Sequence, residues 1–197
     1  MTVETWQEIH KTHVYGRWPA ESVVAYFCGR WAPTERRAVH VLDVGCGAGA
    51  NTRMLVDEDF SVTALDCSQD ALTRTKYNLQ RWDLPKVELV CHDLSNPLPF
   101  SDGHFSAILD SLTLTHLSDD QHRAALAEIA RVLKPGGRFV QRVFIKGCRP
   151  IEGRGYVRYW SPFELAGIAP KGLWMMDGFE ESCNRVKIGF VEWGKGL

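Results

Sequence analysis

A glycine-rich turn is the first feature of this sequence whose residue types suggest a binding site. Residues 43–49 are Asp-Val-Gly-Cys-Gly-Ala-Gly, and they end an apolar, β-branched run. Because glycine has no side chain, these positions allow a tight turn and let a ligand lie against the backbone amides. The residues expected to line such a site are Gly45, Cys46, Gly47 and Gly49.

The turn alone does not identify its ligand. Together with Ala50 it also fits the G-x-G-x-x-A pattern of nicotinamide dinucleotide enzymes. Asp43 argues against a dinucleotide and for a cationic ligand. Its negative charge, two residues before the first glycine, would repel a pyrophosphate and attract a cation.

Two further carboxylates follow the next two predicted strands. Asp66 ends the run at 61–65, where a carboxylate can accept hydrogen bonds from both hydroxyls of a ribose. Asp93 follows the run at 87–91, where it can accept from an adenine amine while Leu94 covers the ring. Carboxyl ends of parallel strands meet at one edge of a sheet, so a nucleoside is the expected ligand.

The elements that position these residues follow from hydrophobic patterning. Five apolar runs alternate with helical patterns, at 39–44, 61–65, 87–91, 105–109 and 138–145. Such alternation predicts the doubly wound α/β class, with a mostly parallel sheet covered by helices on both faces. Two more strands are predicted at 180–186 and 187–193. Too few residues separate them for a crossover connection, so the seven-stranded sheet is expected to end in an antiparallel strand.

The length of 197 residues predicts one domain. We expect residues 1–38 to form a helical lid segment, 39–145 the cofactor-binding core, and 146–197 a substrate loop with the C-terminal strands. Hydrophobic residues make up 45% and charged residues 24% of the chain, which is typical of a folded globular protein.

Composition also excludes several classes of function. The net charge of −1 lacks the basic excess of a nucleic-acid-binding protein, so no nucleic-acid partner is expected. The six cysteines form no C-x-x-C pair, so neither a metal site nor a disulfide framework is expected. The sequence has no run of apolar residues long enough for a membrane span, so we expect a cytoplasmic protein with no membrane partner.

In these motifs the sequence resembles the class I S-adenosylmethionine-dependent methyltransferases, and in particular their small, type 11/25-like members. The matching segments are VLDVGCGAG (41–49), VTALD (62–66), CHDL (91–94), FSAILDSLTLTHL (105–117) and RVLKPGGRFV (131–140). The resemblance implies a Rossmann-like fold and S-adenosylmethionine as cofactor. It places the methionine part on the glycines, the ribose on Asp66, the adenine on Asp93 and Leu94, and Cys67 beside the adenosine.

Three histidines, His116, His10 and His13, are candidates for a general base, which is needed only if the acceptor must lose a proton. His116 follows the fourth predicted strand, which faces the reactive end of the cofactor in the resembled family. His13, like its neighbour His10, belongs to the N-terminal segment that we expect to act as a lid. Asp110 and Tyr15 are the remaining candidates for contacts with the cofactor.

The residues expected at the acceptor are aromatic or basic. The stretch 138–158 holds six basic residues and one acid, Glu152, so guanidinium groups there could bind an acceptor carboxylate or phosphate. A small, anionic or aromatic metabolite is therefore the expected acceptor. The residues assigned to it are Trp18, Arg149, Arg154, Tyr159 and Trp160.

Alternatives stay open at this point. Within the same class, the acceptor could be RNA or a protein. A nicotinamide-dependent oxidoreductase is a different class of enzyme, and a noncatalytic cofactor-binding subunit would bind the same ligand without turnover. The sequence does not determine the methylated atom, and it allows either a monomer or a homodimer.

Overall fold

The computed structural model describes residues 2–12, 18–84, 87–146, 157–170, 172–183 and 186–196. The chain divides into two compact units, residues 2–93 (the N-terminal unit) and residues 94–197 (the C-terminal unit). The division falls inside the segment 39–145 that the sequence suggested as one cofactor-binding core. The arrangement as a single domain stays a prediction.

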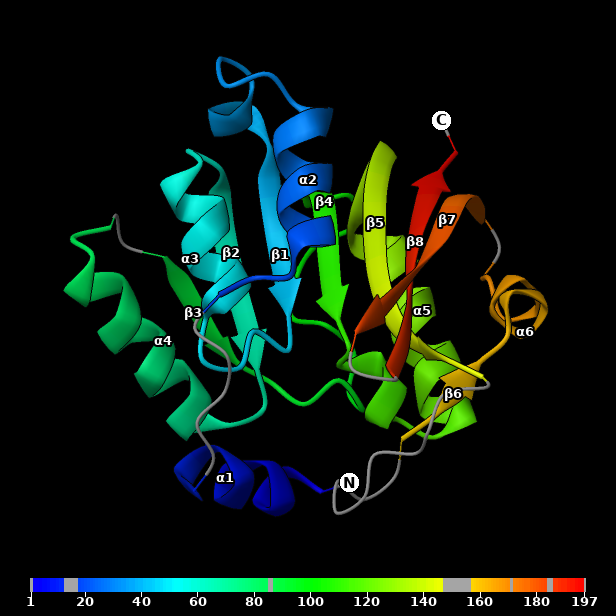
Figure 1. The fold of residues 1–197 in the computed structure, drawn as a ribbon, viewed down its shortest axis with the longest axis horizontal. Coiled ribbons are helices and arrows are strands. Elements are labelled where there is room, and N and C mark those ends of the chain that lie inside the picture. The colour runs from blue at the N-terminus through cyan, green and yellow to red at the C-terminus, as the bar shows by residue number, and fades with distance from the viewer. Residues whose placement is uncertain are drawn as a thin grey trace. The chain divides into compact units, whose positions relative to one another are not determined.

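The N-terminal unit contains three parallel strands in the order β3-β2-β1 (Figure 1). Its strands are β1 (His40–Val44), β2 (Ser61–Asp66) and β3 (Glu88–Cys91). Its helices are α1 (Val3–Thr12), α2 (Glu21–Arg30), the short 3₁₀ helix η1 (Arg36–Ala38), α3 (Ala50–Asp57) and α4 (Gln69–Arg81). Helices α3 and α4 connect successive parallel strands, as the alternating pattern predicted.

The C-terminal unit combines parallel and antiparallel pairing, in the order β4-β5-β8-β7 (Figure 1). Its strands are β4 (Phe105–Ser111), β5 (Leu133–Ile145), β6 (Tyr159–Trp160), β7 (Leu173–Cys183) and β8 (Val186–Lys195). Its helices are the 3₁₀ helix η2 (Leu114–His116), α5 (Asp119–Val132) and α6 (Pro162–Gly167). Strand β4 runs parallel to β5, whereas β8 is antiparallel to both β5 and β7.

The predicted fold class is confirmed, including the antiparallel strand after the parallel ones. Three details differ from the prediction. Strand β5 begins at Leu133, because Phe105 pairs with Leu133 and Ala107 with Arg138, so the intervening Pro-Gly-Gly stretch bulges out of the ladder. Strand β7 begins at Leu173, earlier than expected, and the two-residue strand β6 was not predicted.

The sequence has the S-x-x-Q and S-x-x-E patterns that predict capping boxes at 118–121 and 161–164, and both boxes are present. The Ser118 hydroxyl accepts from the Gln121 N–H, and the Gln121 side chain accepts from the Ser118 N–H at 3.1 Å. At α6, the Ser161 N–H donates to Glu164 Oε2 at 2.8 Å, and the Glu164 N–H donates to the Ser161 hydroxyl at 3.3 Å. These reciprocal bonds explain why both helices begin where the sequence pattern placed them.

The apolar strand residues form the core of each unit. Val41, Leu42 and Leu65 are fully buried in the N-terminal unit, and Ile108 and Phe139 in the C-terminal unit. Within the described ranges, no helix combines the length and the apolar character needed to cross a membrane.

Candidate functional site

The glycine turn adopts the conformation that its sequence predicted. Gly45, Gly47 and Gly49 have φ angles of 66°, 56° and 80°, in the left-handed region that favours glycine. The turn is tied to β2 because the Cys46 N–H donates to the Leu65 carbonyl at 3.0 Å. The three glycines are therefore needed for the turn itself, and their contacts with a cofactor stay predictions.

Asp66 connects the end of β2 to this turn. Its Oδ2 accepts from the Gly47 N–H at 2.9 Å, and its Oδ1 accepts from the Ser68 N–H at 2.9 Å. A carboxylate oxygen has two lone pairs, so each oxygen keeps acceptor capacity for a ligand hydroxyl. Asp66 thus both holds the turn and offers the hydrogen bonds that a ribose requires.

Two polar residues on α4 also hold the turn, and they were not among the residues that the sequence predicted for the site. The Thr75 hydroxyl donates to the Gly47 carbonyl at 2.8 Å, and Asn78 Nδ2 donates to the Ala48 carbonyl at 2.8 Å. Thr75 is fully buried. The available signal was a polar side chain at a position that otherwise follows the apolar spacing of the helix.

Asp43 is a buried carboxylate with one unpaired oxygen. Its Oδ2 accepts from the Thr52 hydroxyl at 2.6 Å, while its Oδ1 has no hydrogen-bond partner within the described residues. Burial raises the pKa of Asp43 to about 6, and the negative charge of Asp66 adds to the effect, although the Thr52 hydrogen bond opposes it. A positive charge on a ligand would stabilise the ionised form of this group.

The two cysteines assigned to the cofactor are neutral thiols. The Cys46 side chain packs with Ala64 and Leu72 in the core, and burial raises its pKa well above the ordinary value. Burial raises the pKa of Cys67 to about 12, and the charges of Asp66 and Asp93 contribute. Neither thiol is activated as a nucleophile. Any contact of Cys46 with a cofactor would therefore come from its backbone.

Helix α1 places His10 against the glycine turn. A Cβ added to Gly47 would lie 3.6 Å from His10 Cε1, and the His10 side chain is buried. Burial lowers the pKa of His10, while the charge of Asp66 opposes this shift. Arg74 on α4 donates to the Lys11 carbonyl at 2.9 Å and thereby fixes the end of α1. An N-terminal cover over the turn was predicted, but His13 and Tyr15 lie outside the described residues.

Trp18, assigned to the acceptor, packs on an arginine. The Arg53 guanidinium lies 4.4 Å from the Trp18 ring centroid and 4.7 Å from that of Trp82. Trp18 is nevertheless 67% exposed. Its contact with an acceptor stays a prediction.

In the C-terminal unit, Asp110 is fully buried and organises the segment after β4. Its Oδ1 accepts from the Thr113 and Leu114 N–H groups at 2.7 and 3.2 Å, and its Oδ2 accepts from Gln141 Nε2 at 3.2 Å. Asp110 therefore caps η2, which carries His116. His116 itself is 8% exposed, and Leu94 is buried. The direct roles of these three predicted residues stay predictions.

The basic stretch after β5 has counterions that its local sequence does not reveal. Lys146 pairs with Glu164 at 2.5 Å, and Arg158 pairs with Asp119 at 3.2 Å and with Glu164 at 3.5 Å. Glu152 is therefore not the sole acid opposed to this stretch. Arg149 and Arg154 lie outside the described residues.

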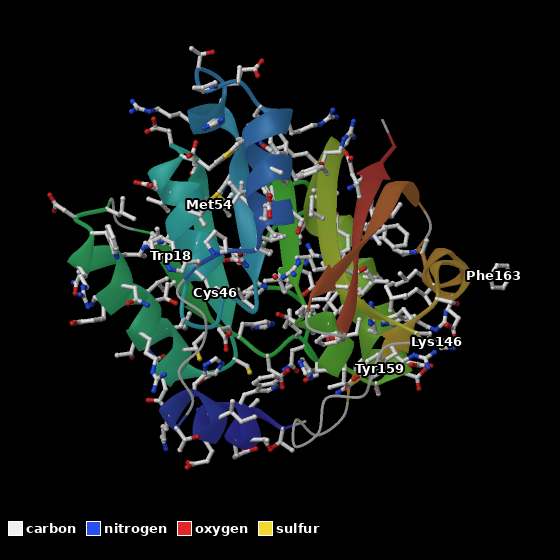
Figure 2. All side chains as sticks on the ribbon, viewed as in Figure 1. Trp18, Cys46, Met54, Lys146, Tyr159 and Phe163 are labelled. Atoms are coloured by element: carbon white, nitrogen blue, oxygen red, sulfur yellow. The ribbon has the colours of Figure 1, made fainter. Side chains whose placement is uncertain are left out.

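The two aromatic residues of β6 have different environments. Trp160 is 1% exposed, with the Arg158 guanidinium 4.6 Å from its ring centroid and the His122 ring 4.8 Å away. Tyr159, which is labelled in Figure 2, is half-buried. Its ring lies 5.7 Å from that of Phe144. Of the two, Tyr159 is the one that retains an accessible surface for an acceptor.

Comparison with known proteins shows which family this chain resembles. Residues 41–137 match the family model described as a methyltransferase domain. The chain is 35% identical over 131 residues to glycine N-methyltransferase of Rattus norvegicus, which covers 56% of this chain and 44% of that protein. It is 38% identical over 124 residues to demethylmenaquinone methyltransferase of Tropheryma whipplei, covering 62% and 49%. The chain spans about half the length of the curated relatives it matches.

Solved structures show the same fold. A protein described for the conversion of a disulfide bond into a thioacetal group during echinomycin biosynthesis has a TM-score of 0.81 at 17% identity, covering 98% of this chain and 93% of that one. The 1,6-didemethyltoxoflavin N1-methyltransferase of Burkholderia thailandensis, solved with its substrate and S-adenosylhomocysteine, has a TM-score of 0.67 at 24% identity, covering 90% and 86%. The resemblance to class I methyltransferases that the motifs indicated is confirmed.

Proposed function

We propose that this protein transfers a methyl group from S-adenosylmethionine to a small-molecule acceptor, because residues 41–137 match the family model of a methyltransferase domain. The observation that carries the proposal is the position of Asp66, whose carboxylate bonds both the glycine turn and the start of α4. This acid and turn together suit a nucleoside with an uncharged ribose.

The charges of the N-terminal unit fit this cofactor. When bound, S-adenosylmethionine supplies a methyl group that its positively charged sulfur has already activated. Asp43 and Asp66 interact electrostatically, and Asp43 holds a buried oxygen without a partner among the described residues. A cationic ligand relieves such crowding of negative charge, whereas a pyrophosphate increases it.

The protein's remaining task is to align an acceptor and to exclude water. A small acceptor is supported by the names of two relatives, glycine N-methyltransferase and demethylmenaquinone methyltransferase. Tyr159 and Trp18 keep exposed surface for a planar acceptor, and Arg149 and Arg154 are proposed to bind its anionic group. His116 lies on η2, whose first turn the Asp110 carboxylate caps, and it is the proposed general base for an acceptor that loses a proton.

Two experiments test the proposal in sequence. Isothermal titration should give heat of binding for S-adenosylhomocysteine and none for NADH. Incubation of the protein with methyl-labelled S-adenosylmethionine and a pool of metabolites should then label a small molecule. Binding of NADH alone would contradict the cofactor assignment. Binding of S-adenosylhomocysteine with label found only in RNA or protein, or in no acceptor at all, would contradict the acceptor class or the catalytic role.

A further inference from the structure

Helix α4 holds the glycine turn through two of its side chains. Thr75 and Asn78 are three residues apart, so both side chains project from one face of the helix. Each donates one hydrogen bond, to the carbonyls of Gly47 and Ala48, and both bonds measure 2.8 Å. Two successive peptide units of the turn are thereby fixed by side chains of a single helix.

These hydrogen bonds determine the direction of one backbone N–H group. A trans peptide is planar and its C=O and N–H point in opposite directions. Because the Gly47 carbonyl points to Thr75, the Ala48 N–H in the same peptide points away from α4. The next N–H, that of Gly49, donates to the Cys46 carbonyl at 2.9 Å. The N–H before it, that of Gly47, donates to Asp66. Of the N–H groups of residues 47–49, that of Ala48 is therefore the one that takes part in neither of these bonds, and it points away from α4.

Packing leaves the turn no room to move toward α4. Gly49 has a φ of 80°, and a Cβ placed on it would lie only 2.7 Å from Thr75 Cγ2. Thr75 Oγ1 also lies 3.9 Å from Cys46 Sγ. The methyl group of Thr75 therefore supports the turn sterically, while its hydroxyl orients the Gly47–Ala48 peptide.

We propose that Thr75 and Asn78 are positioning residues of the cofactor site, which orient the turn 47–49 so that its Ala48 N–H is presented to an anionic group of the ligand. This inference rests on the proposed binding of S-adenosylmethionine, whose carboxylate supplies such a group. Neither residue needs to touch the cofactor. Their effect reaches it through the backbone of the turn.

Paired substitutions separate this role from a general effect on stability. Thr75→Val keeps the shape of the side chain but leaves the buried Gly47 carbonyl without its donor, whereas Thr75→Ser keeps the donor. Thr63→Val is the matched control, because Thr63 is a buried threonine of β2 whose hydroxyl donates to Glu88 at 2.9 Å, outside the turn. Each variant is titrated with S-adenosylhomocysteine and unfolded in urea.

We expect Thr75→Val to raise the Kd for S-adenosylhomocysteine about tenfold, as the loss of one oriented hydrogen bond does. Thr75→Ser should stay within about threefold of wild type, and Thr63→Val should lose stability without losing affinity. If Thr75→Val does not fold, Asn78→Leu, which removes the donor to Ala48, takes its place.

Three results would overturn the inference. Wild-type affinity in the Thr75→Val protein, or in the Asn78→Leu protein that replaces it, would show that the orientation of the peptide does not matter. An equal loss of affinity in Thr63→Val would show an effect of stability alone. A wild-type protein that binds neither S-adenosylhomocysteine nor S-adenosylmethionine would refute the proposed function as well, so the two failures are distinguishable.

Discussion

Replacement of Asp66 by asparagine separates the two tasks of this side chain. In the native protein its two oxygens accept from the N–H groups of Gly47 and Ser68, both at 2.9 Å. Hydrogen bonds to a charged acceptor contribute about 1.5–3 kcal/mol each. Asparagine has one acceptor oxygen, so its NH₂ group must face one of the two amide donors. We therefore expect Asp66→Asn to lower the free energy of unfolding by about 2 kcal/mol.

The same substitution should also weaken binding of the cofactor, by more than its effect on the stability of the fold can explain. Ribose hydroxyls would lose a charged acceptor, and a loss of about 2 kcal/mol corresponds to roughly a thirtyfold increase in Kd. Isothermal titration with S-adenosylhomocysteine measures this change, and urea denaturation measures stability. Asp57→Asn is the control, because Asp57 is an exposed acid at the end of α3 in the same unit. Wild-type affinity in the Asp66→Asn protein would refute the assignment of the ribose site.

Three further substitutions test other parts of the site. Burial raises the pKa of Asp43 in the folded protein to about 6 from its ordinary value of 3.8, so Asp43 destabilises the fold increasingly as pH rises from about 4 to 6. Urea denaturation should show Asp43→Asn gaining up to about 3 kcal/mol over wild type above pH 6, and a difference that does not change with pH would contradict this. Gly49→Ala combines a φ of 80° with a 2.7 Å approach to Thr75 and should cost at least about 1–2 kcal/mol of unfolding free energy; an unchanged urea midpoint would be the contrary result. His116→Ala should lower turnover about 100-fold with an acceptor that loses a proton, while the Kd for S-adenosylhomocysteine stays within about twofold; full turnover in a labelled-methyl assay would remove His116 from the mechanism.

The parts of the molecule that the sequence predicted depend on local signals. The glycine turn, the acid that ends β2 and both capping boxes are each specified within a few residues. Strand and helix periodicity likewise gave the order of elements through β5, because each run carries its own pattern. Asp66 could be placed for the same reason, since it directly follows an apolar run.

The parts that escaped prediction depend on residues far apart in the chain. Thr75 donates to Gly47, which lies 28 positions away in the sequence, and no local pattern near either residue predicts this hydrogen bond. The charge of the segment after β5 was misjudged in the same way. Arg158 pairs with Asp119 on α5 and with Glu164 on α6, so a count of neighbours in sequence overstated the positive charge available to an acceptor.

A crystal structure of the protein grown with equal concentrations of S-adenosylhomocysteine and NADH tests the central claim most directly. We expect S-adenosylhomocysteine on the N-terminal unit, with both ribose hydroxyls within hydrogen-bond distance of the Asp66 carboxylate. Density for NADH at the glycine turn, or a ribose directed away from Asp66, would contradict the proposed cofactor site.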